Sequence, residues 1–461
     1  MERLGPTDAP EGVAPDGLAP DAGHRGGVRG GVRGGVRGVA RSLAGLMRTL
    51  GPGLITGAAD DDPSGISTYS QAGAAFGYAT LWVAVVSFPL MAAVQLMCAR
   101  IGFVARRGLA SVLREHYPRP VLWGACALLL VANTLNIAAD LGGMAAGARL
   151  LTAWPAAVFV PLFAVAIVAL LAFASYVWVA RVFKWLTLVL LAYVLTAFLA
   201  HPDWRAVLRG TVVPHVGGSS DFLLTIVALL GTTISPYLFF WQASQEAEEL
   251  AARDRTRALG TRVRRPRAEW RALRALRLDV LLGMFASNLI MYFIILTAGA
   301  TLHVAGLTNI ETAEQAATAL RPLAGPAASL LFTLGLVGTG MLGVPVLAGS
   351  GAYALAEAAA WRSGIDETPN TAPQFYGLIA LSMVVGTALT FARVDAMRLL
   401  FWSAVVNGVF APPLIVLVLV VCNDRRVMRA DANGWWLNAL GGIAALAMGV
   451  AAVALLVSLI R

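Results

Sequence analysis

The chain has 461 residues, of which 58% are hydrophobic and only 13% are charged. A water-soluble domain carries about 25% charged residues, and one soluble core cannot bury this much apolar side chain. The formal charge is +9, but the basic residues lie between apolar runs of roughly 20 residues, so the pattern indicates a multi-pass membrane protein and not a nucleic-acid-binding one.

Residues 1–45 form the first predicted region. They contain a Gly-Val-Arg repeat between His24 and Gly38 and lack the apolar segment of a signal peptide. A Gly-rich, charged segment of low complexity does not gain enough on burial to become ordered. We therefore expect a disordered cytoplasmic tail whose arginines contact membrane lipids, followed by a transmembrane domain over 46–461.

Eleven apolar segments follow the tail, and they predict an all-α integral membrane protein. The long segment 247–277 is rich in arginine and predicts a cytoplasmic loop, with an amphipathic helix on the membrane surface as the alternative. The predicted spans are 51–76, 79–101, 121–149, 156–174, 179–200, 221–246, 278–301, 327–359, 372–392, 397–421 and 435–459.

The basic residues predict the orientation of these spans. If the N-terminus is cytoplasmic, only seven of the 35 basic residues fall on the outer side and the other 28 fall inside. Cytoplasmic segments carry an excess of Lys and Arg. We therefore expect a plasma (inner) membrane protein with its N-terminus in the cytoplasm and its C-terminus outside.

Two spans predict broken helices. In the first, Asp60, Asp61 and Asp62 precede Pro63 in the middle of an apolar run, and we expect unwinding over about residues 60–65. In the sixth, Pro236 follows a run of glycine and hydroxyl residues. Matching interruptions in spans one and six predict a LeuT-type inverted repeat of five plus five helices, with an ion site at the breaks.

The motifs in these spans resemble the NRAMP family of divalent-metal transporters. Residues Gly51–Tyr78 read GPGLITGAADDDPSGISTYSQAGAAFGY and resemble the family's first helix, while GTTISPYLFFWQAS from Gly231 resembles its sixth. Span three, with NIAADLGG from Asn136, resembles the family's acidic third helix.

The resemblance implies a metal site with several departures from the family pattern. Asp62 matches the family's metal-binding aspartate, and Thr232 matches the residue whose carbonyl binds metal. The family asparagine falls on Gly65, the methionine on Ser235 and the histidine on Tyr237.

The expected metal ligands also include two extra acids and a backbone carbonyl. Asp60 and Asp61 would add charge, and the carbonyl of Ala59 would add a neutral oxygen. The full expected set is Asp62, Asp61, Asp60, Ala59, Thr232 and Ser235. A site built from oxygen atoms suits Mg²⁺ or Mn²⁺, with Fe²⁺ as a further candidate.

A second polar group predicts a proton or ion path. Asn136 and Asp140 share one face of span three, and Asn407 lies in span ten. Hydrogen bonding between helices is the alternative for these residues. Since the family histidine and one family acid are replaced here, by Tyr237 and Gly143, we expect only weak coupling to protons.

The function predicted from the sequence is secondary transport of divalent metal cations by alternating access. The metal is the transported substrate, no cofactor is expected, and neither a nucleic acid nor an obligate protein partner is implied. No nucleophile or phosphate-binding loop indicates an enzyme, and the GxGxxG sequence Gly338–Gly343 predicts helix packing. The alternatives are a transporter of the same architecture for an organic cation or amino acid, and a metal sensor or channel.

Overall fold

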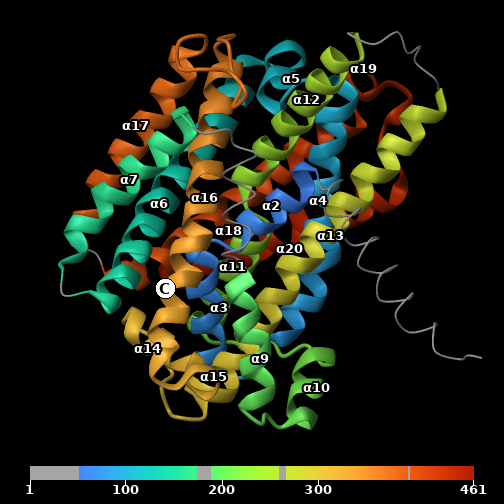
Figure 1. The fold of residues 1–461 in the computed structure, drawn as a ribbon. Coiled ribbons are helices and arrows are strands. Elements are labelled where there is room, and N and C mark those ends of the chain that lie inside the picture. The colour runs from blue at the N-terminus through green and yellow to red at the C-terminus, as the bar shows by residue number, and fades with distance from the viewer. Residues whose placement is uncertain (1–50, 153, 174–187, 259–265, 393–394, 461) are drawn as a thin grey trace, which may run out of the picture. The chain divides into compact units, whose positions relative to one another are not determined.

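The computed structural model describes residues 51–152, 154–173, 188–258, 266–392 and 395–460, and within these ranges every regular element is helical (Figure 1). The predicted tail 1–45 lies outside the described residues. The chain from Gly51 onward is one compact unit.

The described elements of the first half are one interrupted helix, six further α-helices and one short 3-10 helix. Their bounds are α2 Pro52–Asp60, α3 Pro63–Phe76, α4 Leu81–Ala105, α5 Leu109–His116, α6 Arg119–Leu151, α7 Ala156–Phe173, η1 Leu188–Leu190, α9 Leu191–Leu199 and α10 Trp204–Val212.

The second half repeats this order and ends with one additional helix. Its main elements are α11 Ser220–Thr233, α12 Pro236–Ala258, α13 Pro266–Ala298, α16 Ala328–Ala358, α17 Pro373–Thr390, α18 Ala396–Asn423 and α20 Trp435–Ile460. Short elements connect them: η2 Gly299–His303, α14 Ala313–Ala317, η3 Thr318–Leu320, α15 Arg321–Ala324, η4 Gly325–Ala327, α19 Arg425–Met428 and η5 Arg429–Asp431.

Nine helical segments among the described residues are long and apolar enough to cross a membrane. The other two predicted spans are not among them for identifiable reasons. The first is divided into α2 and α3, of nine and 14 residues, and neither reaches the roughly 20 residues that a span needs. The fifth, 179–200, lies partly outside the described residues and is represented by η1 and α9.

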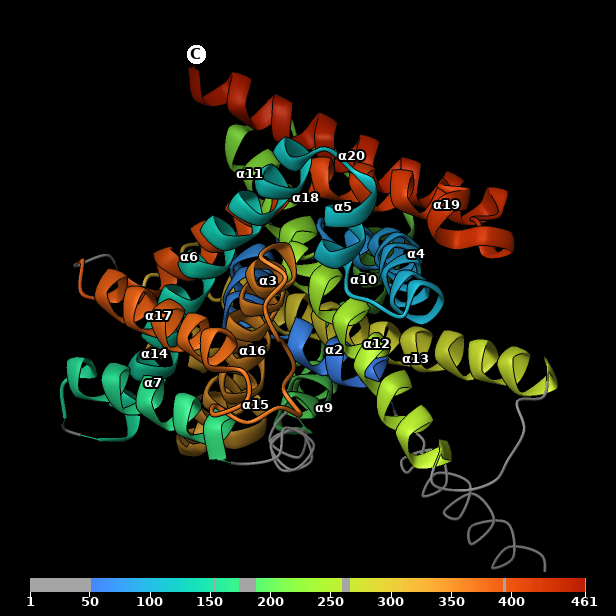
Figure 2. The ribbon, with the colours of Figure 1, turned by 90° about the horizontal axis from the view of Figure 1, so that it is seen from above.

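Packing between the halves follows the pattern of an inverted repeat. Helix α2 of the first span packs on α13 of the seventh, and the corresponding α12 of the sixth packs on α4 of the second. Helices α6 and α16, third in each half, pack on each other. Seen from above, α2, α3 and α16 lie near the middle, α7 and α17 lie at the left edge, and α20 runs along the top with α11 beside it (Figure 2).

The outer helices expose large apolar side chains, as helices that face lipid do. In α17 the side chain of Val384 is 65% exposed, and in α20 that of Leu446 is 68% exposed. Large exposed apolar surfaces are unfavourable in water and favourable in a hydrocarbon layer. All three cysteines, at 98, 126 and 422, are buried free thiols.

The Arg-rich segment 247–277 is more helical than a loop. Helix α12 continues to Ala258 and α13 begins at Pro266, which leaves 259–265 outside the described residues. Alanine, leucine, arginine and glutamate favour helix, so the two spans extend beyond their apolar parts.

Candidate metal-transport site

The first helix break is shorter than the sequence predicts. Helix α2 ends at Asp60 and α3 begins at Pro63, so only Asp61 and Asp62 leave the helical conformation, instead of the whole range 60–65. Proline fits the first position of a helix because its fixed φ is helical and no N–H is needed there. Asp62 caps the new helix through its side chain, which accepts from Gly65 N.

The second break occupies the matching position in the other half. Helix α11 ends at Thr233 and α12 begins at Pro236, and Ile234 and Ser235 lie between them. Ile234 has φ −122° and ψ 60°, which is not helical. Each break therefore consists of two residues followed by a proline that starts the next helix.

Each proline releases one backbone carbonyl four residues before it. In a continuous helix the carbonyl of Ala59 would accept from residue 63 and that of Thr232 from residue 236. Both acceptors lose this partner because proline has no N–H. Side-chain hydroxyls replace it: Tyr237 Oη donates to Ala59 O at 3.0 Å, and Ser235 Oγ donates to Thr232 O at 2.8 Å.

Asp62 lies where the two broken helices meet. Its Oδ1 accepts from Ser64 Oγ at 2.6 Å and from Gly65 N at 2.9 Å. Its Oδ2 lies 3.3 Å from the hydroxyl of Tyr237, which comes from α12. Asp62 is only 2% exposed, so a carboxylate that points toward both breaks is held away from lipid and bulk water.

Asp60 and Asp61 form a separate group with α13. Ser287 Oγ lies 2.8 Å from Asp60 Oδ2 and 3.2 Å from Asp61 Oδ1, and Asp60 Oδ1 has no hydrogen-bond partner among the described residues. No three His, Cys, Asp or Glu side chains in the described part converge on one metal position. The three acids are thus not equivalent, and any metal ligand set around Asp62 needs backbone and hydroxyl oxygens.

Tyr69 of α3 is buried beside Gly65, where an added Cβ atom would lie 3.4 Å from the tyrosine hydroxyl. Thr232 Oγ1 donates to Leu229 O at 2.9 Å. The residues predicted for the metal site therefore lie in one buried polar region, in which Asp62 and Ala59 O share the Tyr237 hydroxyl.

Glycine residues of α16 make room beside this region. A Cβ atom added at Gly343 would lie 3.0 Å from Asp62 Cβ and 3.5 Å from Ala59 O, and one added at Gly340 would lie 3.2 Å from Pro63. These glycines belong to the GxGxxG sequence, and their contacts confirm the predicted packing role.

The predicted path residues lie on the side of α6 that faces the site. Asn136 Nδ2 donates to Asn407 Oδ1 at 2.9 Å, which joins α6 to α18. Asp140 is fully buried, interacts electrostatically with Asp62, and neither of its carboxylate oxygens has a hydrogen-bond partner within the described ranges. Asn136 thus forms a hydrogen bond between helices, whereas Asp140 has two buried oxygens without a hydrogen-bond partner in the described part, and the path remains a prediction.

Ser287 and Gly343 were not identified from the sequence. Ser287 and Asn288 are adjacent polar residues inside an apolar span, and such a pair is the sequence feature that could have indicated a buried polar contact. Gly343 was recognised only as part of a packing motif, because sequence spacing does not show which helix it contacts.

One end of α2 is firmly attached to α13. Asp279 accepts from Gly51 N at 3.0 Å and from Gly53 N at 2.7 Å, which pairs two donors of the first helical turn. Further along α2, Gly57 lies so close to Gly283 that an added Cβ would be 2.3 Å from its carbonyl oxygen. The backbones of α2 and α13 are therefore in contact along this segment.

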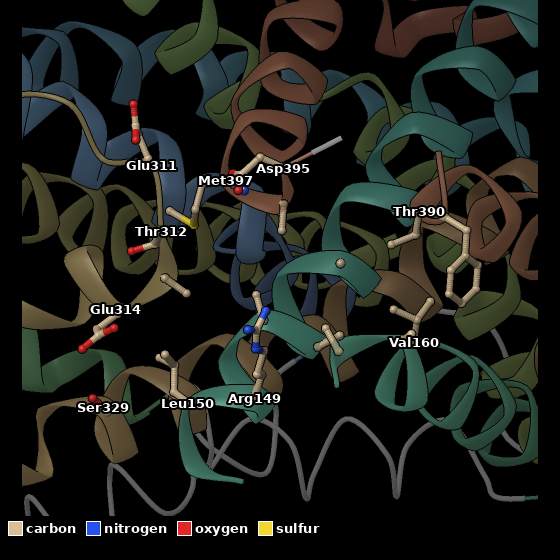
Figure 3. Close-up of a pocket in the computed structure, with 18 residues that line it drawn as sticks. Arg149, Leu150, Val160, Glu311, Thr312, Glu314, Ser329, Thr390, Asp395 and Met397 are labelled. Carbon is tan, nitrogen blue, oxygen red and sulfur yellow. The ribbon is translucent and has the colours of Figure 1, made fainter. Parts of the chain in front are cut away.

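A cavity is lined in part by residues of α14, an element that Figure 1 shows at the end of the molecule opposite α5. It has a volume of about 750 Å³ and lies among α6, α7, α14, α17 and α18. Figure 3 shows Arg149 near Leu150, with Glu311 and Glu314 to one side and Thr390 to the other. These helix ends are the ones that the basic residues predict to be outside.

The fold and the buried site together define a multi-pass membrane transporter with two broken helices in an inverted repeat. Residues 53–458 match the family described as natural resistance-associated macrophage protein-like. The chain belongs to this family, Nramp.

Two curated relatives share one name that describes their activity. A protein of Pectobacterium carotovorum subsp. carotovorum (strain PC1), named divalent metal cation transporter MntH, is 26% identical over 403 residues, which cover 85% of this chain and 90% of the relative. A protein of the same name from Yersinia enterocolitica serotype O:8 is 29% identical over 300 residues, 63% of this chain and 68% of the relative.

Solved structures confirm the fold. The Eremococcus coleocola manganese transporter, in complex with an aromatic bis-isothiourea substituted compound, matches with a TM-score of 0.73 and 17% identity over 88% of this chain and 85% of its own. The nucleobase-cation-symport-1 family transporter Mhp1 matches with a TM-score of 0.54 and 15% identity over 88% and 92%. The predicted family and inverted-repeat fold are thus confirmed.

Proposed function

We propose that this chain carries a divalent metal cation across the membrane, with the metal as its substrate. The observation that supports this most is the Ala59 carbonyl, which Pro63 releases and which shares the Tyr237 hydroxyl with the buried carboxylate of Asp62. Pro236 releases the Thr232 carbonyl at the matching break. Carboxylate, carbonyl and hydroxyl oxygens are the ligands that hard divalent cations prefer. Ser235 would supply a further oxygen.

The proposed substrates are Mn²⁺ and Mg²⁺, with Fe²⁺ as a weaker one. Ser235 stands where the family methionine is expected, so the region around Asp62 contains no thioether ligand at that position. Sulfur ligands favour softer metals, and their loss favours cations that bind oxygen. The names of the curated relatives support divalent metal transport in general.

Asp60 and Asp61 would contribute charge from a second position. Both are buried beside Ser287, so they would lower the electrostatic energy of a cation near Asp62 without both being direct ligands. Asp140, Asn136 and Asn407 would form the polar route that leads to the site.

We propose that transport proceeds by alternating access between the two membrane faces. The cavity at the α14 end would belong to the outer route, and the contact of α2 with α13 would close the inner route. In this orientation the N-terminus is cytoplasmic and the C-terminus lies outside, as the excess of basic residues predicts.

An organic cation or amino acid is the competing substrate class. An amino acid carboxylate would meet three buried aspartates at the first break, and this charge repulsion argues against it. A measurement of which ligands the protein binds therefore distinguishes a divalent-metal transporter from one for an organic cation or amino acid.

Isothermal titration calorimetry on the detergent-purified protein tests the proposal. We expect one Mn²⁺ site per chain that excess Mg²⁺ displaces and that Na⁺ and zwitterionic amino acids leave occupied. Absence of Mn²⁺ binding by folded wild-type protein would reject divalent metal as the substrate.

A further inference from the structure

The hydroxyl group of Tyr237 lies between two proposed metal ligands that come from different parts of the first break. It is 3.0 Å from Ala59 O and 3.3 Å from Asp62 Oδ2. The side chain is 0% exposed, and it belongs to the residue directly after the proline that begins α12. A hydroxyl group from the sixth span thus contacts two oxygen atoms that a cation would also bind.

We infer that Tyr237 is a positioning residue that holds the site in its empty state, that an arriving cation must displace, and that thereby lowers metal affinity. This inference rests on the proposed function. It goes further by assigning to Tyr237 the role of an internal competitor and not of a ligand.

The chemistry of the phenol supports displacement. A tyrosine hydroxyl has one hydrogen, and both of its neighbours here are acceptors that a cation would also use. When a cation binds Asp62 and Ala59 O, its positive charge repels the hydroxyl hydrogen and competes with it for the same two oxygen atoms. The hydroxyl must then turn away or move, and the loss of its hydrogen bonds opposes binding.

Ser235 makes the same kind of contact at the second break, since its hydroxyl donates to Thr232 O at 2.8 Å and to Gly231 O at 2.9 Å. The two hydroxyl groups connect different parts of the fold. Ser235 bonds only to the end of α11 that directly precedes it, whereas Tyr237 joins α12 to the first break. Displacement of Tyr237 is therefore coupled to the contact between the two broken helices.

Displacement of Tyr237 costs the same for every cation that binds Asp62 and Ala59 O, because the hydrogen bonds to be broken are the same. A monovalent cation gains less from these two oxygens than a divalent one gains. Tyr237 would therefore lower both affinities by a similar factor, and the weaker-binding monovalent cation would no longer fill the site.

The test compares Tyr237→Phe with wild type by calorimetric titration of Mn²⁺ into the purified protein. Phenylalanine keeps the buried ring and removes only the hydroxyl. We expect Mn²⁺ to bind about tenfold more tightly, because a hydrogen bond to a charged group is worth roughly 1.4 kcal/mol or more. Tyr193→Phe is the matched control, since Tyr193 is equally buried in α9 and its hydroxyl makes no hydrogen bond to the proposed ligands.

The outcomes separate the inference from the proposed function. Unchanged affinity in Tyr237→Phe would overturn the competitor role, and weaker binding would show that the phenol oxygen is itself a ligand, which also overturns it. If neither wild type nor the variant binds Mn²⁺, the proposed function fails and the inference fails with it.

A measurement on the wild-type side chains covers the case in which Tyr237→Phe does not fold. The nine tyrosines can be labelled with 3-fluorotyrosine and observed by ¹⁹F NMR. Saturating Mg²⁺ should shift the resonance of a tyrosine that loses its hydrogen bond. A spectrum unchanged by saturating Mg²⁺ would contradict displacement.

Discussion

Asp62 has two separable tasks, and two substitutions distinguish them. Its Oδ1 caps α3 through Gly65 N at 2.9 Å and Ser64 Oγ at 2.6 Å, while the charge of the carboxylate is proposed to bind the metal. Asp62→Asn keeps an oxygen at the cap and removes the charge. Asp62→Ala removes both.

The expected magnitudes differ accordingly. Loss of the helix cap costs about 1 kcal/mol, so Asp62→Ala should unfold at a lower temperature than wild type and Asp62→Asn should lie close to wild type. Removal of one partner from a buried, hydrogen-bonded charge pair costs about 2–5 kcal/mol. Both variants should therefore bind Mn²⁺ at least about thirtyfold more weakly.

Two assays on the same purified samples give the answer. Thermal unfolding followed by size-exclusion chromatography gives the unfolding temperature, which depends on the helix cap. Calorimetric Mn²⁺ titration gives the metal affinity, which depends on the carboxylate as a ligand. Near-wild-type Mn²⁺ affinity in folded Asp62→Asn would refute the assignment of this carboxylate to the metal, whatever the stability of Asp62→Ala.

Three other predictions concern the metal, the inner route and the coupling ion. Ser235→Met should shift preference from Mg²⁺ toward Cd²⁺ in competition titrations, because it adds a thioether beside the second break; an unchanged ratio would place residue 235 outside the site. Asp279→Ala leaves two amides of α2 without acceptors, so hydrogen exchange at Gly53 should accelerate about thirtyfold, while α20 serves as the unchanged control. Metal uptake should depend little on a proton gradient, since the family histidine is Tyr237 here and Asp140 is the only acid of the span-three motif; stoichiometric acidification of the vesicle lumen would contradict this.

The positions of the helix breaks could be predicted because their cause is local. Proline removes a specific backbone donor, so Pro63 and Pro236 mark both breaks and also identify Ala59 and Thr232 as the carbonyls that lose a partner. The extent of the first break could not be predicted in the same way. It depends on the cap that Asp62 forms, and this cap lets α3 begin directly at Pro63.

Contacts between helices set the remaining properties of the site. Three adjacent aspartates look equivalent in the sequence, yet Asp60 and Asp61 contact Ser287 of α13, whereas Asp62 contacts Tyr237 of α12. This division follows from the way α2 and α3 pack against two different spans. Local sequence patterns carry no information about that packing, so the role of Ser287 emerged only from the structure.

Uptake of Mn²⁺ into proteoliposomes that contain the purified protein tests the central claim most directly. Wild-type vesicles should accumulate Mn²⁺ above empty vesicles, excess external Mg²⁺ should suppress this uptake, and vesicles with folded Asp62→Asn should match the empty ones. Mn²⁺ uptake that persists in Asp62→Asn, or that equals the empty-vesicle level in wild type, would contradict the account.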